Sequence, residues 1–408
     1  MKYYIKTFGC QMNFSDSERI ATFFEQNDFQ PTDQIDLADL VVFNTCGVRQ
    51  MAEDRVYGQV HNVFKKNPEK IIIVTGCLVH RPDFRQKLEK KVDLFVSIKD
   101  FPKIPTLLKT NKKAKNKFFH SLENERKNKN NTPLEKTQKT TSNDHYYKRV
   151  YSSENDKDNG NEYLKIKPKY DREDSALIPI MTGCNNFCSY CIVPNARGRE
   201  WSRPFEEIQK EIQNLADKNY KEITLLGQNV NSYECRIERE SHFSPFCKGG
   251  SRGFLSFPEL LNTLAQKFPQ ITFNFLTSHP KDYSDELIEV IAKNPNISRE
   301  IHLPVQSGSD KILKLMNRPY TQKHYLNLIK KTQEKIPEIK FSTDVIVGFP
   351  GETEKDFHQT VQVFQKVPFF EAYINKYSPR PGTASFKLKD NVPWEEKKRR
   401  EKELRKYF

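Results

Sequence analysis

Three cysteines with C-x3-C-x2-C spacing stand in the stretch GCNNFCSYC: Cys184, Cys188 and Cys191. A closed structural zinc site takes four ligands, and a four-iron cluster is normally held by four thiolates. If three thiolates hold three irons of such a cluster, the fourth iron can bind a small molecule. An iron of this kind can bind and reduce S-adenosylmethionine. We therefore predict a catalytic [4Fe-4S] cluster on these three thiols.

The alternative interpretation is a zinc knuckle whose fourth ligand is His279 or His302. The spacing of the cysteines, directly after a predicted strand, is unusual for zinc and favours the cluster. Basic side chains follow in ARGREWSRP, and they are interpreted either as phosphate or substrate contacts or as a solvated helix entry. They are Arg197, Arg199 and Arg203.

Three further cysteines end apolar runs near the start of the chain: Cys10, Cys46 and Cys77. The runs are YYIKTFGC, ADLVVFNTC and KIIIVTGC, and they lie about one βαβ repeat apart. Ligands in open parallel sheets bind at the carboxyl ends of strands, so the three thiols should meet at one sheet edge. Buried packing thiols are the alternative. The repeated placement favours a second metal site.

The elements that must position these thiols follow an α/β pattern. The first hundred residues predict an open parallel α/β domain, and six apolar runs after Ser175 predict a partial (β/α)6 barrel with its site at the carboxyl ends of the strands. A polar, lysine-rich stretch between them is predicted to be a disordered linker. The predicted segments are 1–108 (N-terminal domain), 109–170 (linker), 171–390 (barrel), 235–253 (loop insertion) and 391–408 (basic tail).

The barrel runs end in motifs that could cradle a cofactor: GQNVN, TSHP, PVQSGSD and DVIVGFPGETE. Glycines allow a close backbone approach, and amides and hydroxyls can bind the amino and carboxylate groups of S-adenosylmethionine. The predicted contacts are Gly227, Gln228, Asn229, Ser278, Gln306, Asp344 and Gly348.

Length, charge and cysteine content indicate the kind of protein and its partners. The 408 residues suffice for two or three domains, and 67 Lys and Arg against 53 Asp and Glu suit a nucleic-acid partner or, alternatively, a lysine-rich linker. No signal peptide or membrane-length apolar run is present in the sequence, so we expect a cytoplasmic protein without a membrane partner. In a reducing cytosol the eight cysteines are ligands or thiols, with Cys235 and Cys247 incidental.

The motifs together resemble the methylthiotransferase family of the radical S-adenosylmethionine superfamily. KTFGCQMNFSDSE, NTCGVRQMAEDRVYGQV, GCNNFCSYCIVPNARGRE, LLGQNVNSY, HLPVQSGSDKILKLMNRPYT, STDVIVGFPGETEKDF and YSPRPGTAS carry this resemblance and cover nearly the whole chain outside 109–170 and 235–253. It implies two [4Fe-4S] clusters, a radical-generating one on the Cys184 set and an auxiliary one on the Cys10 set, with S-adenosylmethionine as cofactor.

The resemblance also implies a substrate. HLPVQSGSD and LLGQNVNSY fit the branch that adds a methylthio group to carbon 2 of the isopentenylated adenosine at position 37 of tRNA, in the anticodon loop. The alternatives are the branches that act on threonylcarbamoyl-adenosine or on a ribosomal protein aspartate, and a zinc-stabilised RNA-binding protein. An electron donor such as flavodoxin or ferredoxin is expected, and the protein is expected to be a monomer.

The end of the sequence departs from the family pattern. Members usually carry a C-terminal TRAM domain that grips tRNA, whereas this sequence stops at WEEKKRREKELRKYF. We expect either a shortened gene product or tRNA binding by the basic tail and the barrel rim, and weak tRNA affinity.

Overall fold

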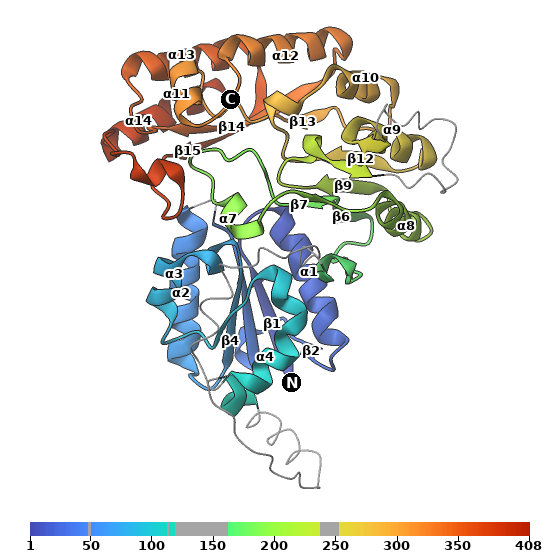
Figure 1. Ribbon diagram of the computed structural model, residues 1–408, viewed down its shortest axis with the longest axis vertical. Coiled ribbons are helices and arrows are strands. Elements are labelled where there is room, and N and C mark those ends of the chain that lie inside the picture. Colours follow the sequence, from blue (N-terminus) through green and yellow to red (C-terminus); the bar gives the residue numbers. More distant parts are fainter. Residues whose placement is uncertain (48–49, 112–113, 119–161, 237–252) are drawn as a thin grey trace. The chain divides into compact units, whose positions relative to one another are not determined.

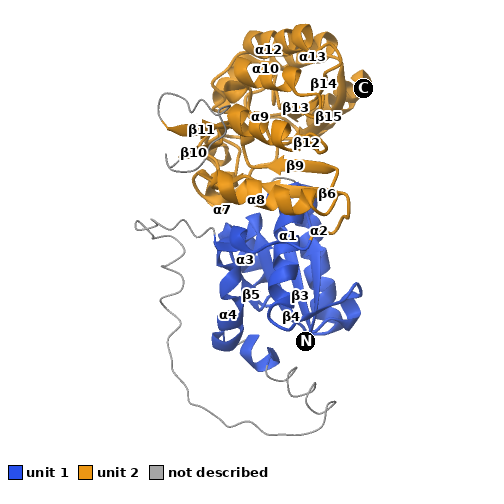
Figure 2. Ribbon diagram, turned by 90° about the vertical axis from the view of Figure 1, so that its right-hand side faces the viewer, with its two compact units in different colours: residues 1–169 blue, residues 170–408 orange. Residues whose placement is uncertain are grey.

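The computed structural model describes residues 1–47, 50–111, 114–118, 162–236 and 253–408 (Figure 1). They form two compact units, residues 1–169 and residues 170–408, coloured blue and orange in Figure 2. Most of the predicted linker and of the predicted loop insertion, with Cys247, lies outside the described residues. None of the described helices combines the length and the apolar character needed to cross a membrane.

Unit 1 is a five-stranded parallel sheet in the order β2-β1-β3-β4-β5. Its central strands are buried at every position, which is why LVVFNT and IIIVTG are continuous apolar runs and not alternating ones. Helices α2 and α3 cover one face and α1 and α4 the other (Figure 1). The strands are β1 (Lys2–Thr7), β2 (Gln30–Pro31), β3 (Leu40–Thr45), β4 (Ile71–Gly76) and β5 (Leu94–Phe95); the helices are α1 (Gln11–Glu25), α2 (Gln50–Lys66), α3 (Pro82–Leu88) and α4 (Ile104–Thr110).

The open parallel sheet predicted from the sequence is confirmed. The two-residue edge strand β2 was not predicted, because QP carries no apolar alternation. The ends of the predicted linker are ordered within unit 1: Tyr163 and Leu164 are buried in the short helix η4 (Glu162–Lys165).

Unit 2 contains six parallel strands in two sheets, β12-β9-β6 and β13-β14-β15. A parallel bridge between Phe273 and Ile297 links the two sheets next to β12 and β13. The partial (β/α)6 barrel is thereby confirmed. The strands are β6 (Ser175–Pro179), β9 (Glu222–Leu226), β12 (Thr272–Phe275), β13 (Glu300–His302), β14 (Lys340–Val347) and β15 (Phe369–Lys376). The helices are α7 (Val193–Arg197), α8 (Phe205–Ala216), α9 (Phe257–Lys267), α10 (Asp285–Lys293), α11 (Asp310–Leu315), α12 (Gln322–Lys335), α13 (Glu354–Lys366) and α14 (Trp394–Leu404).

Two antiparallel pairs decorate the barrel. Strand β7 (Met181–Thr182) pairs with β8 (Trp201–Ser202), and β10 (Glu234–Arg236) pairs with β11 (Phe254–Ser256). The first pair closes the loop that carries Cys184, Cys188 and Cys191. The first of the six apolar runs after Ser175, ALIPIMTG, therefore contains two strands, β6 and β7.

The segment predicted to be a basic tail is helix α14, which packs against β15 and α13. Leu404 is fully buried. Arg400 forms an ion pair of 2.6 Å with buried Glu352, and Lys397 forms one of 2.7 Å with Asp390. These two cations therefore serve the fold of unit 2.

Candidate functional site

The cysteine loop of unit 2 starts at a glycine that no other residue can replace without strain. Gly183 has φ of +83°, and a Cβ there would lie 2.0 Å from the carbonyl oxygen of Arg199. The Cys184 amide donates to the carbonyl of Gly198 over 3.2 Å. The β7–β8 pair thus brings the two ends of the loop together and sets the start of the thiol-bearing segment.

The three thiols of this loop differ in exposure. Cys184 is buried, whereas Cys188 and Cys191 are half-buried, and the seven described cysteines of the chain form no disulfide with one another. Burial raises the pKa of Cys184 to about 11. Such a thiol does not ionise by itself at neutral pH, whereas a metal deprotonates a coordinating thiol outright. The environment suits a metal ligand better than a nucleophile.

Residues far along the chain hold the cysteine loop. Ser189 donates from its amide to the carbonyl of Met316 (2.9 Å) and from its hydroxyl to the carbonyl of Leu315 (2.8 Å). The Asn317 side-chain amide donates to the carbonyl of Phe187 over 3.0 Å, and the Ser385 amide donates to the carbonyl of Ser189 over 2.7 Å. The loop conformation therefore depends on the segments after α11 and after β15.

At the ends of β9 and β12, two of the predicted cofactor contacts have a buried side-chain oxygen without a hydrogen-bond partner among the described residues. The Gln228 side-chain oxygen accepts from the Gly183 amide over 2.6 Å, which ties the GQNVN motif to the cysteine loop. Asn229 donates to Asp282, but its own side-chain oxygen is buried without a hydrogen-bond partner, as is the hydroxyl of Ser278. Buried polar atoms are normally paired, so these two groups fit the binding of a polar ligand.

Gly227 lies against the strand that leads into the cysteine loop. A Cβ at this position would lie 2.6 Å from Cγ of Met181, so the close approach requires glycine.

At the ends of β13 and β14, the predicted cofactor contacts Asp344 and Gln306 form hydrogen bonds within the protein. The His302 ring lies between Ser342 (2.9 Å) and Asp344 (3.0 Å), so one oxygen of Asp344 is already used. Gln306 has φ of +65°, and its amide donates to the carbonyl of Asp344 over 2.8 Å. The pair fixes the backbone where the two strands end.

Gly348 begins a tight turn after β14. Its φ is +69°, and a Cβ there would lie 2.3 Å from Cγ of Lys397. Its amide donates to Glu352 over 2.5 Å, and Glu352 accepts in turn from Arg400. Helix α14 thus backs the turn that the sequence predicts for cofactor binding.

In unit 1 the three thiols follow β1, β3 and β4 at the carboxyl edge of the sheet. Cys46 and Cys77 are buried and come directly after their strands, whereas Cys10 is exposed at the start of α1. A Cβ on Gly9 would lie 2.5 Å from Cβ of Cys46, so the segment before Cys10 touches Cys46. The buried side chain of Asn13 accepts from the Cys10 thiol (3.4 Å) and donates to the carbonyl of Thr45 (3.1 Å).

The two histidines of the zinc alternative have different surroundings. In the part of the chain that the structure describes, no three His, Cys, Asp or Glu side chains converge so that they could hold one metal ion. A structural zinc ion needs four ligands on one centre. Both ring nitrogens of His302 are hydrogen-bonded, to Ser342 and Asp344, whereas His279 accepts from the Lys281 amide at Nδ1 (3.2 Å) and its Nε2 is buried without a partner among the described residues. Thiolates of a four-iron cluster stand wider apart, because each binds a different iron.

Two family models match the chain. The model described as the Radical SAM superfamily matches residues 178–364, and the model described as Uncharacterized protein family UPF0004 matches residues 2–97. The two matches fall within unit 2 and unit 1 respectively.

Curated relatives match 98% of this chain and 70–82% of their own lengths. The tRNA-2-methylthio-N(6)-dimethylallyladenosine synthase of Carboxydothermus hydrogenoformans is 39% identical over 98% of this chain and 82% of its own length. The chain belongs to this family. The synthase of Syntrophomonas wolfei is 38% identical over 98% of this chain and 80% of its own length, and that of Bacillus cereus is 38% identical over 98% and 70%.

The solved structures share only 10–12% identity with this chain, so they show its fold and not its activity. The radical S-adenosylmethionine methyltransferase TsrM from Kitasatospora setae, with cobalamin and a [4Fe-4S] cluster bound, aligns with a TM-score of 0.56 at 12% identity over 94% of this chain and 73% of that chain. The cobalamin-dependent enzyme OxsB aligns with a TM-score of 0.52 at 10% identity over 94% and 54%.

The three arginines that follow Cys191 differ in their surroundings. Arg203 is buried, forms an ion pair of 2.7 Å with Glu211 and donates to the carbonyl of Pro179, so both of its interpretations, as a phosphate or substrate contact and as part of a solvated helix entry, were wrong. Arg199 is exposed, with its guanidinium 6.0 Å from the centre of the Phe187 ring. Arg197 is buried in helix α7.

Sequence reasoning missed Arg318 and Tyr320, although both stand in the motif LMNRPYT that carried the family resemblance. The Arg318 guanidinium donates to the thiol of Cys188 over 3.5 Å and to the Tyr320 hydroxyl over 2.8 Å. No feature of the local sequence distinguishes this arginine from a solvated one.

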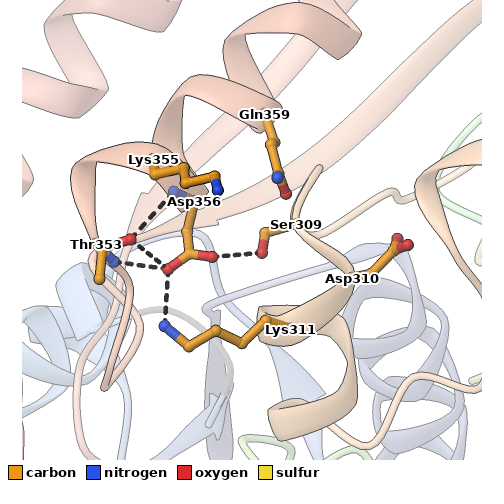
Figure 3. A pocket seen from close by; sticks show the side chains of 7 residues that line it. All are labelled: Ser309, Asp310, Lys311, Thr353, Lys355, Asp356 and Gln359. Carbon is orange, nitrogen blue, oxygen red and sulfur yellow. Dashed lines mark hydrogen bonds and ion pairs between the residues drawn. The ribbon is translucent and has the colours of Figure 1, made fainter.

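A hollow between α11 and α13 contains none of the predicted site residues (Figure 3). At its centre Asp356 accepts hydrogen bonds from Ser309, Lys311 and Thr353 (Figure 3). These bonds fill the capacity of the carboxylate, and the pairing holds its pKa well below the usual range. The hollow is a structural junction between two helix starts.

Proposed function

We propose that this chain is a radical S-adenosylmethionine enzyme that transfers a methylthio group to carbon 2 of N6-dimethylallyladenosine at position 37 of tRNA. The near full-length relationship to synthases of that name carries this assignment. The two-unit fold supports it, because unit 2 presents three thiols beside polar strand ends and unit 1 presents three thiols at one sheet edge.

Two sets of thiols are proposed to hold the cofactors. Cys184, Cys188 and Cys191 hold a radical-generating [4Fe-4S] cluster, and the auxiliary cluster is held by Cys10, Cys46 and Cys77. When bound, the clusters and S-adenosylmethionine supply the electron, the deoxyadenosyl radical and the sulfur for the reaction.

The protein's own groups around the first set would bind and orient the cofactor. The unpaired side-chain oxygen of Asn229 would accept a hydrogen bond from its polar end, and the unpaired Ser278 hydroxyl would donate or accept one. Gln228 fixes the distance between the GQNVN motif and the cysteine loop through its bond to Gly183. The turn at Gly348 lets the backbone approach closely, and Gln306, Asp344 and Gly227 complete the proposed contacts.

The proposed partners follow from the reaction. An adenosine in the single-stranded anticodon loop can be splayed into a pocket without opening a duplex. The reduction needs a one-electron donor such as flavodoxin or ferredoxin, and we propose a monomer that acts in the cytoplasm.

The test is the iron and sulfide content of the anaerobically reconstituted chain, measured beside two triple-alanine variants. One variant removes the Cys10 set and the other the Cys184 set. We expect about eight irons in the parent and about four in each variant, since each set holds one four-iron cluster. Four irons in the parent that vanish only with the Cys184 set would contradict the auxiliary assignment.

Single substitutions connect the clusters to the reaction. Cys188→Ala is expected to abolish reductive cleavage of S-adenosylmethionine, whereas Cys46→Ala retains cleavage and loses the methylthiolated base. Mass spectrometry of tRNA nucleosides after reaction with dimethylallylated tRNA measures the product. Methylthiolated base from Cys46→Ala, or modification of a ribosomal protein in its place, would contradict the proposed function.

A further inference from the structure

Arg318 is a buried cation beside a cluster-binding cysteine. It follows helix α11, and only 7% of its surface is exposed. Its guanidinium makes three kinds of contact: Nε donates to the Tyr320 hydroxyl (2.8 Å), Nη2 to the carbonyl of Pro304 (3.0 Å), and Nη1 to Sγ of Cys188 (3.5 Å). The three acceptors are a hydroxyl, a carbonyl and a thiol, and none of them is a carboxylate.

The guanidinium has no carboxylate partner among the described residues. Two other buried arginines in unit 2 do have one: Arg203 pairs with Glu211 at 2.7 Å, and Arg400 pairs with Glu352 at 2.6 Å. A buried charge without a counter-ion costs several kcal/mol, so such charges are normally paired or bind an ion. The missing negative charge must come from a group that joins the site.

We propose that Arg318 is the counter-ion of the cluster held by Cys184, Cys188 and Cys191, and that it positions Cys188 and raises the reduction potential of that cluster. The inference rests on the proposed cluster assignment. Thiolate ligation gives the site a negative charge that the guanidinium neutralises, and reduction by one electron adds a further negative charge beside it. Hydrogen bonds to cluster sulfurs and local charge are established determinants of cluster potentials.

The surrounding residues hold the guanidinium in place before any cluster binds. The Tyr320 hydroxyl accepts from Nε and donates to the carbonyl of Val305 over 2.9 Å. The Arg318 guanidinium carbon lies 5.2 Å from the Tyr320 ring centre, and the His279 ring stands edge-on to Tyr320 at 5.6 Å. A charge fixed in this way acts on the cluster without having to reorganise, which makes its electrostatic effect larger.

The experiment uses the full chain with Cys10, Cys46 and Cys77 replaced by alanine, so that only one cluster is reconstituted. Arg318→Met and Arg318→Lys are compared with this parent, and Arg203→Met is the matched control for loss of another buried arginine. Iron content is measured first. The ratio of reduced to oxidised cluster is then determined by electron paramagnetic resonance at one fixed solution potential.

We expect Arg318→Met to lower this ratio at least about tenfold, because a hydrogen bond from a charged group is lost. Arg318→Lys should lower the ratio of reduced to oxidised cluster by about threefold, since the positive charge remains but the planar set of guanidinium donors is lost. Arg203→Met should leave the ratio unchanged even where it lowers the melting temperature. Full iron content with an unchanged ratio in Arg318→Met would overturn the proposal.

Two further outcomes keep the test decisive. If Arg318→Met does not load iron, the ratio in Arg318→Lys decides, and an unchanged ratio there overturns the proposal. If the parent itself binds no iron, the cluster assignment on the Cys184 set fails, and the inference about Arg318 falls with it.

Discussion

The two sets of thiols are positioned in different ways. In unit 1 each cysteine stands at or just beyond the end of a strand, so the register of a parallel sheet places the three thiols. In unit 2 the three thiols lie on one loop between β7 and β8, and residues more than a hundred positions away hold that loop. A site built on strand ends depends on local sequence, whereas a site built on a loop depends on distant segments.

Each unit also contains a buried ion pair, and the two pairs differ in whether they contact a predicted site residue. Arg81 pairs with Glu53 at 2.6 Å within unit 1, and Arg400 pairs with Glu352 at 2.6 Å within unit 2. Only the second pair continues to a predicted cofactor contact, through the Gly348 amide. The C-terminal helix therefore supports the turn at Gly348, which is predicted to contact the cofactor.

The largest effect is expected from breaking these pairs. Arg400→Met and Arg81→Met should each lower the free energy of unfolding by about 3–5 kcal/mol, because each leaves a buried carboxylate uncompensated. Only Arg400→Met should also raise the KM for S-adenosylmethionine, by about fivefold or more, through the Gly348 turn. Calorimetry and steady-state cleavage assays measure the two quantities. An equal rise of KM in Arg81→Met would break the comparison.

A smaller effect is expected from two glycines that face the thiol segments. Gly183→Ala places a Cβ 2.0 Å from the carbonyl oxygen of Arg199, and Gly9→Ala places one 2.5 Å from Cβ of Cys46, both at positive φ. Each should cost at least about 2 kcal/mol of stability. Iron analysis should show loss from the Cys184 set in the first variant and from the auxiliary set in the second. Loss from both sets in either variant would contradict independent positioning.

The smallest effect is expected from Asn317→Gly. Asn317 has φ of +55°, which glycine tolerates, so the substitution removes only the side-chain amide that donates to the carbonyls of Phe187 and Asn186. The loss of about 1 kcal/mol should speed the release of iron from the Cys184 set to a chelator by about fivefold. Asn219→Gly, at φ of +64° after α8, is the matched control and should leave release unchanged. Equal release rates in both variants would mean that the distant contact does not support the loop.

The fold could be predicted wherever apolar runs match strands. Runs such as LVVFNT and IIIVTG have no polar face, which identifies them as central parallel strands. The edge strand β2 and the short pair β7–β8 could not be found, because two-residue strands carry no periodicity. The buried face of α14 could not be predicted, because a lysine and an arginine in a highly charged segment are normally expected to be solvated. Lys397 and Arg400 are instead buried and pair with Asp390 and Glu352.

The sequence by itself determined the family, the six thiols and their grouping into two sets, because cysteine spacing and strand ends are local properties of the chain. Only the tertiary structure decided which charges serve the site. Arg203 and Arg318 are both arginines near motif residues, yet Arg203 is neutralised by Glu211, whereas Arg318 lies beside Cys188 and has no carboxylate partner in the described part of the chain. The sequence separations of these pairs range from a few residues to more than a hundred, and burial, not spacing, fixes what each charge can do.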